Sequence, residues 1–170
     1  MSKQTETEAK VAEIVKKQIG NNGIKQEMYE MISIQTVVCD AGENVLVVKV
    51  PKVILKEVHM SYGNVVKAIK QQFHDYFVMF IRNFEAECKN GEAIKQGYSE
   101  RESNWIANAC FPYLLTGIRT DVYSINESVT NILLEARAAF SKAEMDTIGA
   151  VLSELLKKRF VVDVNHHTKN

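Results

Sequence analysis

The stretch Val45–Pro51 places the strongest constraint on how this chain can fold. It reads Val-Leu-Val-Val-Lys-Val-Pro, so only Lys49 interrupts a run of aliphatic, mostly β-branched side chains. Such a run fits a strand that is buried on both faces better than a strand on the surface. Pro51 has no backbone N–H to give to a ladder, but its fixed φ suits the first turn of a helix. We therefore predict a central strand that passes directly into a helix.

The apolar positions after Pro51 predict one long helix from Lys52 to Phe73. They fall three or four residues apart, which places them on one helical face: Leu55, Val58, Tyr62, Val66, Ile69 and Phe73. A second run of aromatic and β-branched residues, Tyr76–Arg82, then predicts another strand. Strand, helix and strand together form the predicted core unit.

Capping and turn residues organise the chain before this unit. Thr5 and Glu8 have the spacing of a capping box, and Gly20–Gly23 ends the helical pattern that follows. Asp40–Glu43 supplies turn chemistry between two β-rich stretches, which indicates a hairpin. The predicted elements are a helix over Thr5–Ile19, a weak helical segment over Ile24–Met31 and a strand over Thr36–Cys39 that pairs with the central strand.

The same signals recur after the core unit. Ser99 with Glu102, and Ser141 with Glu144, again have capping-box spacing, and Pro112 disfavours a helical conformation at Phe111. The predicted elements are a loop over 84–98, a helix over Ser99–Phe111, a hairpin of Thr116–Ile125 and Val129–Arg137, a helix from Ser141, a strand over Phe160–Val164 and a polar tail. Leu133, Leu134 and Ala136 would also fit a helix, so both alternatives stay open.

These elements predict an α/β fold of the α+β type, as one domain with a mixed β-sheet, two hairpins and helices packed on the sheet. We divide the chain into residues 1–44 (N-terminal helix and first hairpin strand), 45–164 (core) and 165–170 (tail). A chain of 170 residues can bury roughly 70% of its unfolded surface without a disulfide staple. The cysteines, Cys39, Cys88 and Cys110, are odd in number and far apart, which suits a reducing compartment.

Several functional classes lack their sequence signals. The N-terminus has no apolar segment of a signal peptide, and no apolar run approaches the roughly 18 residues of a membrane span. The glycines form neither a dinucleotide-binding fingerprint nor a P-loop, and GxSxG, HExxH and CxxC are absent. His166-His167 lies in a polar tail without other ligands at metal-binding spacing. We therefore expect a cytosolic, non-enzymatic protein with no cofactor and no metal.

Basic residues are concentrated in the core unit, although the chain as a whole carries 21 basic and 21 acidic residues. At about 100° per residue, one sector of the predicted long helix contains Lys52, Lys56, His59, Lys67 and Lys70. A row of cations can neutralise successive phosphates of a nucleic acid. The alternative is an ordinary solvated helix flank, since exposed lysines are common.

Three other features have simpler structural explanations. Lys157–Arg159 closes the last helix, where cations interact favourably with the helix dipole, and phosphate contact is the alternative. Trp105 is expected to pack in the core. Cys110 is expected to be a buried structural thiol and not a nucleophile, because no histidine is near it in sequence.

From Val45 to Val164 the chain resembles the seven-e protein family of the eukaryotic small ribosomal subunit. The first resemblance is Val48-Lys49-Val50-Pro51, followed by the lysine-bearing helix to Phe73 and the strand Phe77–Ile81. The second is Phe111–Arg119, which matches the family's Phe-Pro, aliphatic, Gly, Arg spacing. Hairpin, helix and final strand then follow in register.

The resemblance implies a structural component of the small (40S) subunit that contacts ribosomal RNA and neighbouring ribosomal proteins. It also implies a role in subunit assembly and rRNA maturation, in cytoplasmic ribosomes with a nucleolar assembly stage. Carried over by position, the residues expected to contact RNA are Lys52, Lys56, His59, Lys67, Lys70, Arg82 and Arg119.

The chain departs from the family where a long basic loop is expected. Residues 84–98 are short and contain Glu85, Glu87 and Glu92. This suggests a reduced RNA contact or docking mainly through protein neighbours. The main alternative function is a free cytosolic adaptor that binds protein and not RNA. A small metabolic enzyme is the third alternative and would require a deep pocket with perturbed titratable groups.

Overall fold

The computed structural model of the chain describes residues 4–20, 23–39, 44–84 and 98–164. The helices in these ranges are α1 (Glu6–Ile19), α2 (Gln26–Tyr29), α3 (Lys52–Met60), α4 (Tyr62–Gln72), α5 (Tyr98–Cys110) and α6 (Lys142–Leu156). The strands are β1 (Ser33–Val38), β2 (Asn44–Val50), β3 (Tyr76–Arg82), β4 (Leu115–Ser124), β5 (Glu127–Leu134) and β6 (Phe160–Val164). None of these helices is long and apolar enough to cross a membrane.

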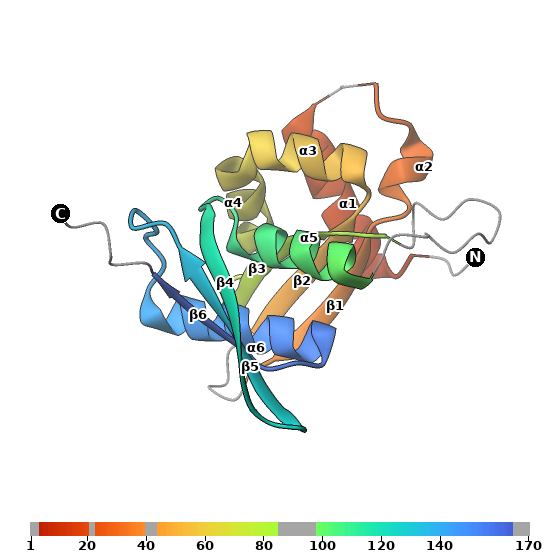
Figure 1. Ribbon diagram of the computed structural model, residues 1–170. Coiled ribbons are helices and arrows are strands. Elements are labelled where there is room, and N and C mark those ends of the chain that lie inside the picture. Colours follow the sequence, from red (N-terminus) through yellow and green to blue (C-terminus); the bar gives the residue numbers. More distant parts are fainter. Residues whose placement is uncertain (1–3, 21–22, 40–43, 85–97, 165–170) are drawn as a thin grey trace.

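The strands form two three-stranded sheets, in the orders β1-β2-β3 and β4-β5-β6 (Figure 1). Both sheets follow one plan: an antiparallel hairpin, a helical connection and a third strand parallel to the second. The predicted α+β class, the mixed strand directions and the two hairpins are confirmed. The strands are divided between two sheets because each helical connection returns its third strand to the hairpin that precedes it.

Strand β2 lies in the middle of the first sheet and is buried on both faces, as predicted. Side chains alternate between the faces of a strand. Leu46, Val48 and Val50 therefore enter one hydrophobic cluster with α1, α3 and α4. Val45 and Val47 enter the other, with α5, α6 and the inner face of the second sheet. Apart from Lys49, the residues Val45–Val50 are apolar because each face of β2 has its own core.

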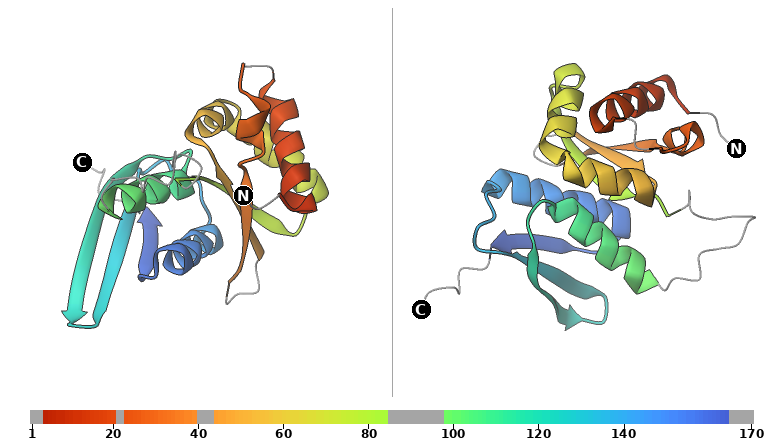
Figure 2. Two further views of the ribbon diagram at one scale, coloured as in Figure 1. Left: turned by 90° about the vertical axis from the view of Figure 1, so that its right-hand side faces the viewer. Right: turned by 90° about the horizontal axis from the view of Figure 1, so that it is seen from above.

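The molecule is built in layers around this sheet. The left view of Figure 2 shows α1 and α4 on one side of the first sheet, and α5, α6 and the second sheet on the other. Two close contacts hold α6 against β6. Its Gly149 lies so near β6 that an added Cβ would be 3.0 Å from the carbonyl oxygen of Phe160. Ser153 Oγ also accepts a hydrogen bond from the backbone N–H of Phe160 (3.1 Å).

The single helix predicted over Lys52–Phe73 is wrong, because it divides at Ser61 into α3 and α4. Ser61 has φ −126° and ψ 32°, outside the helical region. It is both the C-cap residue of α3 and the N-cap residue of α4. Its N–H donates to the carbonyl oxygen of Val58 (3.1 Å), and its own carbonyl accepts from the N–H of Val65 (3.0 Å). Serine is favoured at such caps over helix interiors. The apolar periodicity continues across the break, so it gave no sign of it.

Most of the other predicted elements are confirmed with small shifts of their ends. Thr5 and Ser141 form complete capping boxes. Helix α5 begins at Tyr98, before the predicted cap at Ser99, and ends at Cys110, before Pro112. The weak segment over Ile24–Met31 contains only the short α2. Leu133 and Leu134 lie in strand β5, not in a helix.

Some predictions fall outside the described residues. These are the turn over Asp40–Glu43, nearly all of the loop over 84–98 and the tail with His166-His167. Trp105 and Cys110 are buried in the core, as expected. Burial raises the pKa of the Cys110 thiol to about 12, so it is not a thiolate at neutral pH.

Candidate nucleic-acid interface

Four lysines lie exposed on the two helices that follow β2. Lys52 and Lys56 belong to α3, and Lys67 and Lys70 belong to α4. The opposite faces of both helices are buried against the first sheet through Ile54, Leu55, Val58, Val65 and Ile69. Within the described residues none of the four forms an ion pair with an acidic side chain. Their charges are therefore available to an external polyanion.

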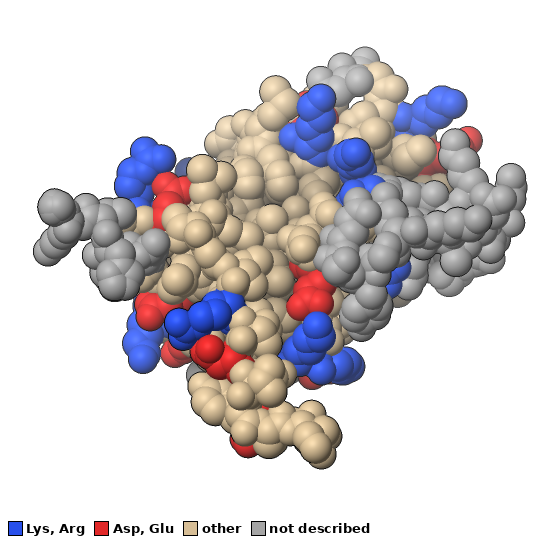
Figure 3. Space-filling view, in the orientation of Figure 1, with Lys and Arg blue, Asp and Glu red and all other residues tan. Residues whose placement is uncertain are grey.

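The break at Ser61 changes how these lysines are arranged. The right view of Figure 2 shows α3 and α4 running in clearly different directions. The continuous row that was predicted for one helix is therefore wrong, and the lysines form two pairs on two helix axes. Figure 3 shows Lys and Arg atoms over the α3 side of the molecule, while basic and acidic atoms lie closer together lower on that face.

His59, near the end of α3, packs against the segment after α5. Its ring stacks on Phe111, with centroids 3.8 Å apart, and meets the ring of Tyr62 edge-on at 6.2 Å. Nε2 of His59 is buried and has no hydrogen-bond partner among the described residues. Burial lowers the pKa of His59, so the neutral form is favoured. A neutral, stacked imidazole adds no charge toward a phosphate.

Arg82 lies at the end of β3, beside the start of α3. Val50 and Arg82 are register partners, which brings Arg82 to the same end of the sheet as Lys52. The Trp105 Nε1–H donates to the carbonyl oxygen of Arg82 (2.9 Å), and the Arg82 guanidinium lies 4.4 Å from the Phe84 ring centroid. Arg82 is thus half-buried in an aromatic setting.

Two further basic residues, Arg101 and Lys49, lie near the same aromatic rings as Arg82. Neither was among the residues predicted to contact RNA. The guanidinium of Arg101 lies 5.4 Å from the Phe84 centroid, and Lys49 Nζ lies 5.5 Å from the Trp105 centroid. Cations over aromatic faces are attracted by the ring quadrupole. Only the packing of α5 against β3 brings Arg101 here, and no sequence spacing would have indicated it.

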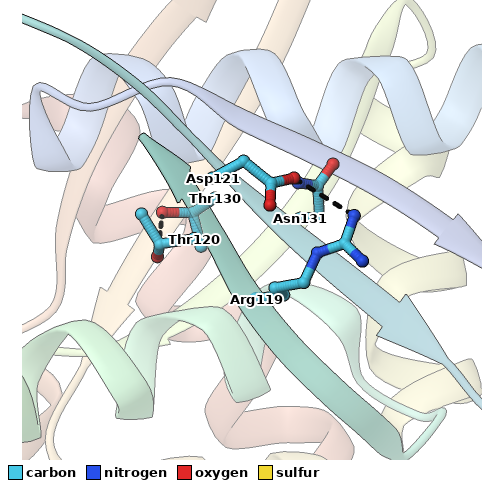
Figure 4. A network of polar contacts seen from close by, with 5 residues as sticks. All are labelled: Arg119, Thr120, Asp121, Thr130 and Asn131. Carbon is cyan, nitrogen blue, oxygen red and sulfur yellow. Dashed lines mark hydrogen bonds and ion pairs between the residues drawn. The ribbon is translucent and has the colours of Figure 1, made fainter. Parts of the chain in front are cut away.

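Arg119 lies apart from the other candidates, on strand β4 of the second sheet. Its guanidinium forms an ion pair with Asp121 (3.1 Å), and Asp121 also accepts a hydrogen bond from Asn131 (2.9 Å). Figure 4 shows this network beside the contact between the Thr120 and Thr130 hydroxyls, which is 3.1 Å long. The Arg119 charge is therefore largely offset within the hairpin.

The basic end of α6 is also partly neutralised. Lys157 pairs with Glu154 (3.2 Å), and Lys158 pairs with Glu102 of α5 (2.9 Å). Lys157 is the C-cap residue and has a left-handed conformation, with φ 56° and ψ 37°. Two of the three cations in Lys157–Arg159 are therefore paired with carboxylates of the protein itself.

A cavity next to Lys70 bears on the enzyme alternative. It measures about 130 Å³ and is lined by residues that include Tyr62, Phe77, Phe111 and Glu144. Sites for small molecules usually occupy about 300–1,000 Å³. This cavity is therefore too small for a typical substrate, whereas a more open hollow of about 480 Å³ lies between the turn of the β4–β5 hairpin and Lys157–Arg159.

Comparison with known proteins identifies the family. No protein-family model matches the chain. A curated relative, small ribosomal subunit protein eS7 of Encephalitozoon cuniculi (strain GB-M1), is 54% identical over 170 residues, which is 100% of this chain and 100% of the relative. The chain belongs to the eS7 family. The resemblance noted over Val45–Val164 is confirmed, and the relationship extends over the N-terminal residues as well.

In this eS7-family chain the structure separates the predicted RNA-contacting residues into five places. Lys67 and Lys70 lie on α4, Lys56 lies on α3, and Lys52 and Arg82 lie at one end of the first sheet. His59 packs inside an aromatic cluster, and Arg119 lies on another sheet. The four exposed lysines remain the best candidates for electrostatic contact, because they combine exposure with the absence of an ion pair in the described part of the chain.

Proposed function

We propose that this chain is a structural constituent of the small ribosomal subunit and contacts ribosomal RNA through Lys52, Lys56, Lys67 and Lys70. The observation that carries the proposal is the 54% identity, over the whole length of both chains, to a small ribosomal subunit protein. Identity at this level over the full chain makes a shared structural role the simplest explanation.

The exposure of the four lysines supports a phosphate contact. Ammonium groups that face solvent can displace the counterions condensed on RNA, and this gives affinity without base recognition. A-form RNA exposes its phosphates while its deep major groove excludes side chains. We therefore propose contacts with backbone and shape, and we leave His59 and Arg119 out of them because one is held neutral and the other is paired.

The proposal includes neighbouring ribosomal proteins as partners and a role in subunit assembly and rRNA maturation. It places the working protein in cytoplasmic ribosomes after nucleolar assembly. The overall charge balance of 21 basic and 21 acidic residues supports a mixed set of partners, because a chain held by RNA alone would be expected to be more basic.

Sedimentation of cell extract through a sucrose gradient tests the proposal. We expect the chain to co-migrate with the small subunit, and to dissociate progressively as salt is raised, because counterion release weakens at high salt. A protein-binding adaptor would instead remain in the light fractions. That result would rule out the ribosomal function.

Charge reversal tests the lysines separately from subunit membership. Lys67→Glu and Lys70→Glu are expected to reduce incorporation into the small subunit. Lys25→Glu is the matched control, because Lys25 is also an exposed lysine but lies beside α2, at the opposite end of this layer from α4 (Figure 1). Equal incorporation of all three variants would remove α4 from the RNA contacts.

A further inference from the structure

The outer edge of β4 is open in the described part of the chain. The second sheet has the order β4-β5-β6, so β5 covers only one edge of β4 and no other described strand covers the other. Its register with β5 is uninterrupted from Gly117 to Val122, with irregularities on either side. A regular edge strand presents backbone N–H and C=O groups at which another chain can pair.

Exposed apolar side chains accompany this edge. Ile118 is 48% exposed and Val122 is 71% exposed, and the spacing of four residues places both on one face of β4. Tyr123 (68%), near the end of β4, and Ile125 (101%), in the turn, are exposed as well. Figures 1 and 2 show that this end of the hairpin projects beyond α5 and α6, so the helices do not cover it.

The first sheet provides a contrast. Its edge strand β1 also has an exposed valine, Val38, which is 69% exposed. The other β1 residues are less apolar or more buried, so Val38 is an isolated exposed side chain of an ordinary kind. Compared with β1, strand β4 combines its open edge with several exposed apolar side chains.

Charge decides which class of partner fits this edge. The hairpin from Leu115 to Leu134 contains one basic residue, Arg119, and two acidic residues, Asp121 and Glu127. Arg119 is already paired with Asp121. The basic group Lys157–Arg159 lies beyond β5, just before β6, and lines one hollow with Asn126–Ser128 at the turn of the hairpin, away from the outer edge of β4. The regular part of the edge, Gly117–Val122, therefore presents no net charge to a polyanion, whereas its open backbone and exposed apolar side chains fit a polypeptide.

We propose that the β4 edge binds an extended segment of a neighbouring protein, which adds as a further strand to the second sheet. This proposal rests on membership of the small subunit. The segment pairs with Gly117–Val122 through backbone hydrogen bonds and places apolar side chains at alternate positions beside Ile118 and Val122.

The two sides of the first sheet would then bind different classes of partner. The lysines of α3 and α4 contact RNA from one side of the first sheet. The β4–β5 hairpin, on the other side, contacts protein by burial of apolar surface. Contacts of the second kind depend weakly on salt, whereas contacts of the first kind depend on it strongly.

Site-specific photo-crosslinking in intact particles tests the proposal. A tagged chain with p-benzoylphenylalanine in place of Val122 or, as the control, Val38 replaces the cell's own copy, and small subunits are purified by sedimentation before irradiation. We expect the probe at position 122 to crosslink to a single protein of the subunit, and the probe at position 38 to give no such product. Proteolysis and mass spectrometry of the product should locate the crosslink in an extended segment.

Other outcomes overturn the proposal in distinguishable ways. If the chain is in the small subunit but position 122 crosslinks to rRNA, to a second copy of this chain or to nothing, the docking edge is wrong and the ribosomal function stands. If the chain is absent from the small subunit, the proposed function fails and this inference fails with it.

A pair of substitutions gives a quantitative check. Val122→Asp places a charge in the proposed contact, and Val38→Asp places the same charge at an equally exposed valine. In competition with the unmodified chain, Val122→Asp is expected to lose incorporation by about tenfold, the effect of roughly one unpaired charge at an interface, while Val38→Asp is expected to compete equally. Thermal unfolding of both purified variants establishes that each is folded. Equal incorporation of two folded variants contradicts the proposal.

Discussion

The imidazole ring of His59 lies flat against the phenyl ring of Phe111, with centroids 3.8 Å apart and planes inclined by 7°. The contact joins α3, which covers one face of the first sheet, to the segment that follows α5 on the other face. Tyr62 meets Phe111 edge-on at 4.9 Å and completes the cluster. Because Nε2 of His59 is buried without a partner among the described residues, a proton on this ring would be both poorly solvated and unpaired.

The stability of the fold is therefore expected to decrease as pH falls below about 6.5, the usual pKa of histidine. Burial lowers the pKa of His59 in the folded state, so between the two pKa values the unfolded chain binds more protons. The free energy of unfolding then rises with pH in this range and is lost progressively on acidification. Urea unfolding at a series of pH values between 5 and 7.5 measures the slope.

His59→Phe keeps an aromatic ring at the stacking position and removes the titrating group, so it should flatten this part of the slope. His74→Gln is the control, because the His74 ring is exposed and its Nδ1 contacts only the carbonyl oxygen of Lys70 (3.1 Å). An unchanged slope in His59→Phe would show that another group controls the acid sensitivity.

The salt dependence of RNA binding is expected to separate paired from unpaired cations. Replacing both Lys67 and Lys70 with glutamine should reduce the slope of log affinity against log salt by about 1.4–1.8, since each phosphate contact contributes about 0.7–0.9. Arg119→Gln should change the slope little, because Asp121 already holds this guanidinium. Filter binding to small-subunit rRNA fragments measures both, and an equal effect of Arg119→Gln would contradict this assignment.

The two helical glycines Gly149 and Gly63 are expected to respond in opposite directions to alanine. A Cβ at Gly149 would lie 3.0 Å from the backbone oxygen of Phe160, so α6 would have to move away from β6. We expect Gly149→Ala to lower the free energy of unfolding by about 1–2 kcal/mol, as overpacking outweighs helix propensity.

Gly63 serves as the matched control for this effect. It lies in the first turn of α4, and nothing is within 4 Å of an added Cβ. Gly63→Ala should therefore raise the free energy of unfolding by about 0.5 kcal/mol through the entropy of the unfolded chain. Denaturant unfolding of both variants gives the comparison. Stabilisation by Gly149→Ala would mean that α6 and β6 pack less closely than described.

Lys157 is expected to be a position where glycine stabilises the fold. Its φ of 56° at the end of α6 is a conformation that costs a residue with a Cβ about 1–2 kcal/mol. Lys157→Gly should raise the free energy of unfolding by about 0.5–1 kcal/mol, after the extra freedom of glycine in the unfolded chain is subtracted. Lys157→Ala keeps the strain and loses only an exposed ion pair with Glu154, so it should stay close to the original. Thermal unfolding distinguishes the two, and equal values would exclude strain as the cause.

Local signals in the sequence were sufficient for most individual elements. Ser141 and Thr5 cap their helices through hydrogen bonds with residues three positions later, so each capping box lies within one helical turn. The apolar run of β2 indicated burial on both faces, because a residue exposed on either face would be expected to be polar. The hairpins followed from turn residues between β-rich runs.

The candidate site was harder to predict because it depends on how elements pack. The break at Ser61 divides the lysines between two helix directions, and the apolar pattern does not record a change of axis. Arg101 comes close to Phe84 only through the docking of α5, and Asp121 neutralises Arg119 through the conformations of their side chains on one strand. The helical wheel covered only the helix after Pro51; Arg119 was carried over from the family resemblance without its partner, and Arg101 was not selected.

Residue order was enough for most of the elements, for the two-sided burial of β2 and for the family, because periodicity, caps and full-length identity are properties of the chain alone. Only the tertiary structure decided that His59 is a neutral packed ring, that Arg119 is paired and that the β4 edge stays open. These properties depend on distances between residues far apart in the chain. Charge and exposure at a site are set by the groups that surround it in space.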